Sequence, residues 1–323
     1  MIRSSFWNEP IMNLKRFRIL LLSGPVLLLM ATILLCTAEA QSPAPETAPP
    51  LFPKGALFSY SSNFYSRDLP AAGDQLSTTS QPTFSHHGNF VFIWGFYPNF
   101  DLTVSVPVVT NRFKNQNEIG GTGIGDSLVL LKYRFYRHDS ERGTTQASVT
   151  AGPKFPTGST ALTGPGGIRL PASLQPGSGS TDFFFGLNWT YTGLFHVKRL
   201  VADEDFHSLF RTTGTQETHL GNDFESRFWL SYRPYESKEV RREWFIGPTF
   251  VWLRSNDEKI AGIKQKASGG DVLLAGVTTY FGVSPGMHVW LDLEWVIAHS
   301  DGESFQPLRR QVSIGITRQF RFF

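Results

Sequence analysis

The chain has 323 residues, of which 41% are hydrophobic and 14% aromatic, with 30 lysines and arginines against 27 acidic residues. The aromatic content and the net charge of only +3 exclude an intrinsically disordered chain, and the weak basic excess gives no reason to expect a nucleic-acid partner. The single cysteine, Cys36, excludes a disulfide framework and a thiolate zinc site. Nothing in the sequence predicts a metal or another cofactor.

The first forty residues have the pattern of a secretory signal peptide. Lys15, Arg16 and Arg18 lie just before an almost unbroken apolar run over residues 19–35, and Ala-Glu-Ala at residues 38–40 forms a small-x-small cleavage site. A lipoprotein would use Cys36 as its lipidated residue, but Leu35 stands where a small residue is expected. An uncleaved anchor is the other alternative, since the apolar run is just under the length of a spanning helix. We expect residues 1–40 to be cleaved.

Residues 41–55 are rich in proline and predict an extended periplasmic lead-in. From residue 56 to residue 323 the apolar pattern has a period of two, which indicates strands. At residues 287–297 every odd position is apolar, whereas His288, Asp292 and Glu294 occupy even positions. One face of such a strand is wholly apolar and the other is charged. No later segment is apolar enough for a spanning helix, so a mature chain that crosses a membrane does so with strands.

The alternating segments number about twelve, and no helical pattern interrupts them. The expected strands are residues 56–66, 84–97, 100–113, 125–137, 145–155, 181–191, 206–213, 222–233, 244–253, 271–281, 287–297 and 310–323. The seventh of these has the weakest pattern, and the link before it, residues 192–205, is longer than a regular scheme predicts. We therefore expect an all-β, antiparallel fold whose register is least certain between residues 192 and 221.

The links between the expected strands alternate between short and long, which is the layout of an outer-membrane barrel with periplasmic turns and extracellular loops. The short links are residues 98–99, 138–142, 236–239 and 283–286, and the long ones are residues 67–83, 114–124, 156–180, 254–270 and 298–309. A soluble β-sandwich also alternates. The export signal, the aromatic residues near strand ends and the chain end inside a strand favour an up-and-down transmembrane barrel in the outer membrane of a Gram-negative bacterium.

The run from Gly121 to Phe135, GTGIGDSLVLLKYRF, resembles the GxGD and LKYRF hairpin entry of the family called MetA-pathway of phenol degradation. Residues 153–159, PKFPTGS, are similar to that family's PTG turn. The resemblance implies a transporter-like outer-membrane barrel, and the family name suggests hydrophobic or aromatic cargo. The terminal Phe323 resembles the signature that the outer-membrane assembly machinery reads. The last strand departs from this pattern, because Phe323 is out of step with its apolar positions.

A transport role would depend on the lumen, where charges opposite the apolar face are expected to point. The candidate pore-lining residues are Asp126, Lys132, Arg134, Lys154, Asp182, Glu225, Arg227, Asp292 and Glu294. Both signs are present, which suits a weakly selective polar pore or a lumen closed by ion pairs. We expect a porin-like channel for passive uptake of small molecules, with membrane lipid around it. The alternative is a closed structural or surface-interaction barrel.

The link over residues 156–180 is rich in Gly, Pro, Ser and Thr and is the best candidate for a functional segment outside the wall. Such a loop folds inward as a constriction, stays outside as a mobile lid, or is simply a variable surface loop. An outer-membrane lipid hydrolase is a third hypothesis, and His207-Ser208 is the place to look for its catalytic pair. No third residue is placed to orient the histidine, and neighbours on a strand point to opposite faces. We therefore expect no enzymatic activity.

Overall fold

The computed structural model describes residues 49, 51, 53–67, 82–113, 119–141, 143–237, 242–266, 268–300 and 308–321. All of them belong to one unit of the chain, Thr37–Phe323. The predicted signal peptide, most of the predicted lead-in and Phe323 lie outside the described residues. No helix of the described chain is both long enough and apolar enough to cross a membrane.

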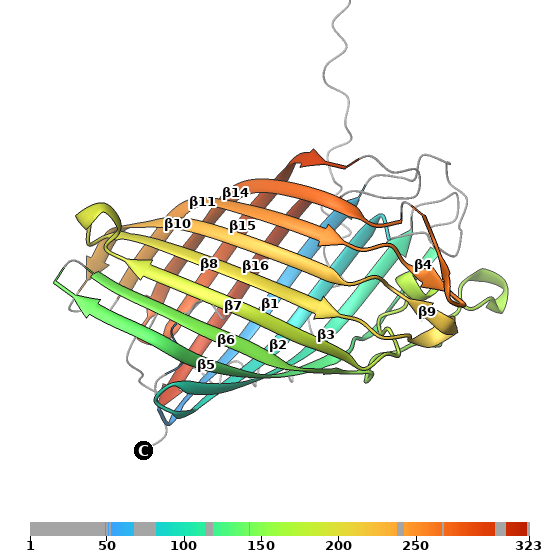
Figure 1. The fold of residues 1–323 in the computed structure, drawn as a ribbon, viewed down its shortest axis with the longest axis horizontal. Coiled ribbons are helices and arrows are strands. Elements are labelled where there is room, and N and C mark those ends of the chain that lie inside the picture. Colours follow the sequence, from blue (N-terminus) through green and yellow to red (C-terminus); the bar gives the residue numbers. More distant parts are fainter. Residues whose placement is uncertain are drawn as a thin grey trace, which may run out of the picture. The chain divides into compact units, whose positions relative to one another are not determined.

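Twelve antiparallel strands form a closed wall (Figure 1). They are β1 (Gly55–Arg67), β2 (Phe84–Tyr97), β3 (Phe100–Phe113), β5 (Ser127–Ser140), β6 (Gly143–Phe155), β7 (Asp182–Thr192), β8 (Leu200–Phe210), β10 (Asp223–Ser237), β11 (Arg242–Ser255), β14 (Gly270–Ser284), β15 (Met287–His299) and β16 (Leu308–Arg321). Each pairs with its neighbours along the chain, and β1 also pairs with β16, from Gly55 opposite Arg321 onward. The predicted up-and-down barrel of about twelve strands is confirmed.

Shorter elements lie between the wall strands. Strand β4 (Ile119–Ile124) pairs with the end of β3, and β9 (Thr218–His219), β12 (Lys259–Ile260) and β13 (Ile263–Lys264) form a small separate sheet. The single helical turns are η2 (Pro165–Gly167), η3 (Ala172–Leu174), η4 (Leu194–His196) and η5 (Thr215–Glu217). Figure 1 shows β4 and β9 at the same end of the barrel.

The two ends of the barrel differ in the length of their links. One end, here called the loop end, has links over residues 68–83, 114–126, 156–181, 211–222, 256–269 and 300–307. The other, called the turn end, has links over residues 98–99, 141–142, 193–199, 238–241 and 285–286, and both β1 and β16 have their outer ends there. The predicted alternation of short and long links is therefore present all around the wall.

The seventh wall strand begins earlier than the sequence pattern predicted. The expected strand was residues 206–213, whereas β8 covers Leu200–Phe210 and shortens the link before it to residues 193–199. The acidic run at residues 203–205 concealed the alternation. Asp203 and Asp205 accept hydrogen bonds from Thr190 and Asn188, while Glu204 accepts one from Ser226. Polar partners on both faces thus allow this strand to carry charge where an apolar residue was expected.

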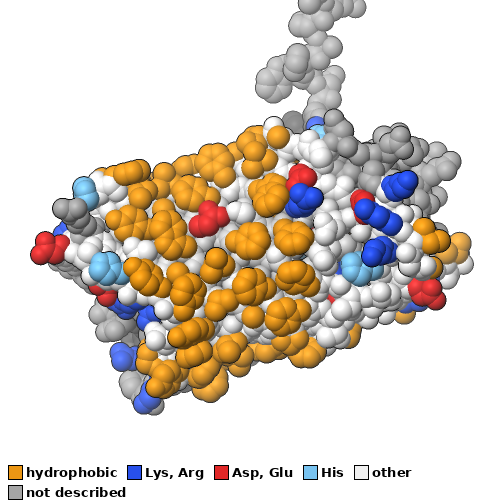
Figure 2. Space-filling view, in the orientation of Figure 1, with side chains coloured by type: hydrophobic (Ala, Val, Ile, Leu, Met, Phe, Trp, Pro, Cys, Tyr) orange, Lys and Arg blue, Asp and Glu red, His pale blue; other side chains and the backbone are white. Residues whose placement is uncertain are grey.

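The outer face of the barrel is apolar. Figure 2 shows hydrophobic side chains covering the wall between its two ends. Exposed aromatic and aliphatic side chains come from all around the wall, including Phe58, Trp94, Leu131, Phe185, Trp189, Phe250, Val277 and Trp295. Near the turn end the rings of Phe100 and Tyr133 stack with centroids 4.6 Å apart. An exposed apolar wall with rings near a strand end is what a bilayer requires, so this face contacts lipid and the soluble sandwich is excluded.

Candidate functional site

The inward side chains surround a cavity of about 530 Å³. Every one of the twelve wall strands contributes lining residues. Alternation along the strands puts polar side chains inside: on β1 the lining positions are Ser59, Ser61, Asn63, Tyr65 and Arg67, every second residue. The barrel therefore has an apolar exterior and a largely polar interior, the arrangement of a membrane barrel that holds water.

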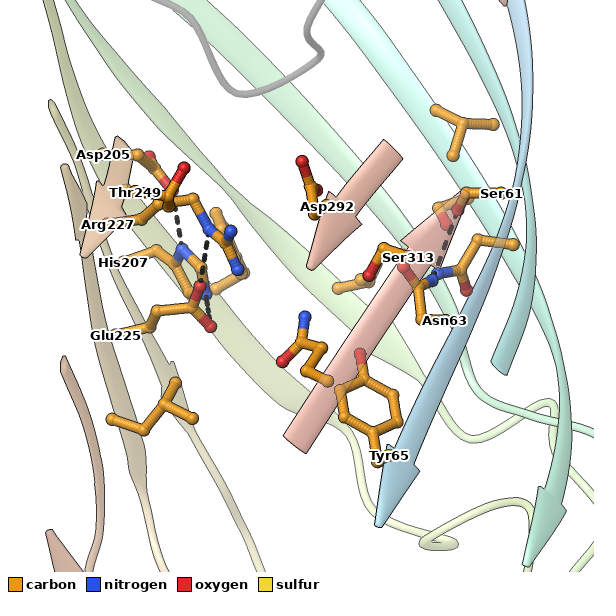
Figure 3. Close-up of a pocket in the computed structure, with 18 of the residues that line it drawn as sticks. Ser61, Asn63, Tyr65, Asp205, His207, Glu225, Arg227, Thr249, Asp292 and Ser313 are labelled. Atoms are coloured by element: carbon orange, nitrogen blue, oxygen red, sulfur yellow. Dashed lines mark hydrogen bonds and ion pairs between the residues drawn. The ribbon is translucent and has the colours of Figure 1, made fainter. Parts of the chain in front are cut away.

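One side of the cavity carries a chain of charged side chains, here called the charged belt (Figure 3). Its members are Asp205, His207, Glu225, Arg227 and Glu294. His207 Nδ1 lies 2.9 Å from Asp205, and its Nε2 lies 3.4 Å from Glu225. Arg227 reaches Glu225 through Nε at 3.3 Å and Glu294 through Nη1 at 2.5 Å. Both ring nitrogens of His207 therefore face carboxylates.

Strand register explains why the belt forms. Glu225 lies directly opposite His207 across the β8 and β10 pair, and Arg227 lies directly opposite Asp205. Arg227 then crosses β11 and β14 to reach β15. Gly276 on β14 leaves room for this crossing, since a Cβ there would lie 2.8 Å from Cγ of Glu294. The belt therefore connects wall strands that are not neighbours.

The belt continues into neutral hydrogen-bonding groups. Asn188 donates to Asp205, and Ser148 and Thr150 on β6 donate to the side-chain Oδ1 of Asn188 at 3.3 and 3.2 Å. Ser61, Asn63 and Ser313, which are neutral and polar, lie opposite the belt in Figure 3. Arg67, Lys132 and Asp292 also line the cavity outside the belt, so charge is not confined to one side of the lumen.

Aromatic side chains also line the cavity. They are Tyr65, Phe184, Trp229, Tyr280 and Trp290, from five different strands. Tyr280 lies against His288, with ring centroids 5.0 Å apart. The cavity therefore offers flat apolar surfaces as well as hydrogen-bonding groups.

The turn end of the lumen is filled with side chains. On β16 the cavity lining stops at Ser313, although the strand continues to Arg321, and Thr317 and Gln319 beyond it are fully buried. Leu51, from the predicted lead-in, packs with Leu57 and Ile93, and its backbone N–H donates to Asp101 at 3.1 Å. The cavity is therefore closed toward this end.

The nine candidate pore-lining residues fall into three places. Lys132, Glu225, Arg227 and Asp292 line the cavity, and Glu294 is buried in its ion pair with Arg227. Arg134 lies at the turn end, where it donates to Gln146 at 2.7 Å and to Asn99. Asp126, Lys154 and Asp182 form a separate cluster at the loop end and are not among the lining residues. A pore-lining role for these residues stays a prediction.

Two belt members, Asp205 and His207, were absent from the predicted set. They lie on β8, whose start the sequence pattern misplaced. The alternation that begins at Leu200 is the signal that could have found them. The structure also places His207 in the cavity lining, while Ser208, its neighbour on the strand, points to the opposite face. In the described chain these two side chains are not placed to act together.

Among the described residues, no group of three or more His, Cys, Asp or Glu is arranged to hold a metal ion.

Comparison with known proteins gives a family match and several structural likenesses. Residues 70–313 match the family described as "Putative MetA-pathway of phenol degradation". No curated protein matches the chain. The fold is similar to an outer membrane channel from Pseudomonas putida F1, with a TM-score of 0.62 and 12% identity over 87% of this chain and 100% of that one. At this identity the likeness shows the fold.

Two weaker likenesses are also to bacterial barrels. The β domain of the Bordetella autotransporter BrkA has a TM-score of 0.47 and 9% identity, over 82% of this chain and 100% of that one. The CymD monoaromatic hydrocarbon channel has a TM-score of 0.40 and 8% identity, over 84% of this chain and 90% of that one. These two scores are too low to add to the fold assignment.

Proposed function

We propose, from the premise that this chain belongs to the MetA-pathway of phenol degradation family, that it is an outer-membrane channel for passive uptake of small molecules. The observation that carries the proposal is the polar cavity of about 530 Å³ inside a closed barrel whose outer face is apolar. Water in such a lumen gives solutes a path through the bilayer core. The channel named among the structural likenesses agrees with this function.

The lining suits small aromatic molecules that carry polar groups. Rings such as Phe184 and Trp229 offer stacking surfaces, while Asn63 and Ser313 offer hydrogen bonds. A pure hydrocarbon would displace water from these polar groups without replacing its hydrogen bonds. The family name suggests aromatic cargo, and the polar lining favours its hydroxylated or carboxylated forms.

The loop end faces the cell exterior and the turn end faces the periplasm in this proposal, as in other outer-membrane barrels. Residues 1–40 serve as a cleaved signal peptide and residues 41–55 as the periplasmic lead-in. The last strand, β16, then presents the C-terminal residues through Phe323 to the assembly machinery. Sequencing the N-terminus of the mature protein tests the first of these assignments, since it should begin at Gln41.

A closed structural or surface-interaction barrel is the second candidate. The observation that favours it is the packed turn end, where Tyr280, His288 and Gln319 are buried. In a channel this layer has to rearrange or leave a path narrower than the cavity. A lipid hydrolase has less support, because His207 and Ser208 point to opposite faces.

Single-channel conductance of the detergent-folded chain in a planar bilayer tests the proposal. We expect discrete current steps, and we expect vesicles that contain the protein to swell in small hydroxylated aromatic solutes. Heat-denatured protein at the same concentration is the control. Silence in both assays would favour the closed barrel, and hydrolysis of phospholipid that is lost on His207→Ala or Ser208→Ala would favour the hydrolase.

A further inference from the structure

Residues 156–180 pack inside the loop end of the barrel. Phe113 at the end of β3 is fully buried and forms an apolar cluster with Leu170 and Leu174, beside Leu162. Phe113 has the same strand parity as Thr103 and Ser105, which line the cavity, so its ring points inward. The segment therefore covers the inner face of β3 and does not extend away from the wall.

The extent of the cavity agrees with this placement. On β1, β11, β14 and β16 the lining reaches the loop end of each strand, at Arg67, Ser255, Gly270 and Leu308. On β3 the lining stops at Ser105, although the strand continues to Phe113. The segment therefore narrows the loop end of the lumen on the β3 side. Along β1, β11, β14 and β16 the cavity still extends to the loop end.

The two ends of the segment cross at a narrow neck. Gly177 donates to the carbonyl oxygen of Ser159 at 2.9 Å, and a Cβ on Gly158 would lie only 2.6 Å from Cα of Gly177. Ser159 in turn donates to the carbonyl oxygen of Ile124 on β4 at 2.8 Å. Only glycine permits so close a crossing of two backbones. This accounts for the glycine in the PTG turn.

The carboxylate of Asp126 binds both sides of this neck. Its Oδ1 accepts from the Gly158 N–H at 3.0 Å, and its Oδ2 accepts from the Ser178 N–H at 2.8 Å and the Ser178 hydroxyl at 2.6 Å. Lys154 on β6 lies 2.9 Å from Asp126 and 2.5 Å from Asp182. The side chains of these three residues are at most 8% exposed. We call Asp126, Lys154, Asp182 and Ser178 the latch.

The glycines before Asp126 make room for the same segment. A Cβ on Gly121 would lie 2.5 Å from Leu162, and one on Gly123 would lie 2.9 Å from Ser159 and 3.0 Å from Pro176. The GxGD motif thus contributes both the surface on which the segment lies and the carboxylate that holds it. Neither role is needed for a strand that only forms the wall.

We propose that Asp126 is a positioning residue that holds residues 156–180 as an internal constriction, so that the latch sets the size limit of the channel. This inference rests on the proposed channel function. The segment then acts as a fixed part of the lumen and not as a variable surface loop. Its Gly, Pro and Ser content serves the close packing of the neck.

The test compares Asp126→Asn with Asp139→Asn. The first variant removes the charge of the latch, and its amide group cannot accept the hydrogen bonds from both Gly158 and Ser178. The second removes a carboxylate from the opposite, turn end of β5, whose ion pair with Arg137 is more than half exposed at both partners. For Asp126→Asn we expect at least a twofold rise in single-channel conductance, faster swelling of vesicles in larger solutes and faster proteolysis of residues 156–180. Asp139→Asn should match the wild type.

Leu174→Ala provides a second variant if Asp126→Asn does not fold. It loosens the segment at the Phe113 cluster, leaves all charges in place and should also raise the conductance. Unchanged conductance and an unchanged size limit in a folded Asp126→Asn protein would overturn the inference while the channel stands. Conductance that appears only in the variant would support the segment as a plug. If neither the wild type nor any variant conducts, the proposed channel function is wrong, and the proposed size limit is wrong with it.

Discussion

The latch and the charged belt are both clusters of charged side chains on the inner wall. The latch packs against a folded segment, whereas the belt borders the cavity. In the latch, Lys154 and the two carboxylates beside it are at most 8% exposed and face a folded segment. In the belt, Arg227 is 16% exposed and Glu225 is 21% exposed, and both face the cavity. Carboxylate and basic side chains therefore hold a loop in the latch and line the cavity in the charged belt. Contact with the cavity distinguishes the two clusters more sharply than charge does, although Glu294, the belt member paired with Arg227, is itself fully buried.

The largest expected difference is in folding stability. Lys154→Met leaves two buried carboxylates without their shared cation, so we expect a loss of about 3–5 kcal/mol. Arg227→Met should cost less, about 2–3 kcal/mol, because only Glu294 is left buried without its cation, while Glu225 faces the cavity and can be solvated there. Urea unfolding of the barrel in lipid vesicles, followed by tryptophan fluorescence, measures both. Equal losses would mean that the belt is as dry as the latch.

The second difference is in ion selectivity. Arg227→Met removes a cation from the lumen and leaves Glu225 facing the cavity without its arginine partner, so the ratio of cation to anion permeability should rise severalfold. Lys154→Met should change this ratio little, because its carboxylates are not among the lining residues. Reversal potentials in a salt gradient measure the ratio. The double variant Arg227→Met with Glu225→Gln should return part of the way to the wild type.

The latch should also respond to acid in a defined direction. Burial raises the pKa of the Asp126 carboxyl, but hydrogen bonds from Ser178 and Lys154 outweigh it and leave this pKa below its ordinary value. The latch is therefore fully stable above the ordinary aspartate pKa of about 3.9 and is lost as the pH falls through the lowered value. We expect conductance to rise below that pH in the wild type. The rise should be absent in Asp126→Asn, and an equal rise in both would assign it to other carboxylates.

The turn end offers a contrast with the latched loop end. There the lumen is closed by packing around Leu51 and by its backbone hydrogen bond to Asp101. Leu51→Ala removes most of the buried side chain and should cost about 2 kcal/mol of local stability. We expect faster proteolysis near residue 51 and more frequent current steps, with no change in the size limit. A changed size limit would mean that the narrowest point lies at the turn end.

Sequence alone predicted the wall well because its period of two persists over whole strands, as at residues 287–297. It misplaced β8 because three consecutive acidic residues at positions 203–205 carry no alternation. It selected Asp126, Lys154 and Asp182 as lumen charges, yet could not separate them from Glu225 and Arg227. That separation depends on where residues 156–180 fold, which is set by contacts with Phe113 and the backbone crossing at Gly158. Such contacts join residues far apart in sequence and leave no periodic signal.

The smallest expected effect concerns the single acidic side chain in the middle of β8 that faces lipid. Glu204 lies directly opposite Trp189 and Phe228, both on the apolar outer face, and accepts a hydrogen bond from Ser226 at 2.6 Å. A carboxylate on the lipid face is unfavourable, although less so than a lysine or arginine. Glu204→Leu should therefore stabilise the barrel by about 1 kcal/mol and leave conductance unchanged.

Ser226→Ala is the matched control for this position. It removes the hydroxyl donor and leaves the carboxyl group on the lipid face, so it should destabilise the barrel slightly. The same urea unfolding assay measures both variants. A loss of stability in Glu204→Leu would show that the carboxyl group is favoured where it lies, and the outer face at β8 would then have to meet a polar partner in place of acyl chains. Stabilisation would instead place this part of the wall against lipid, in contrast to the belt on the other side of the same strands.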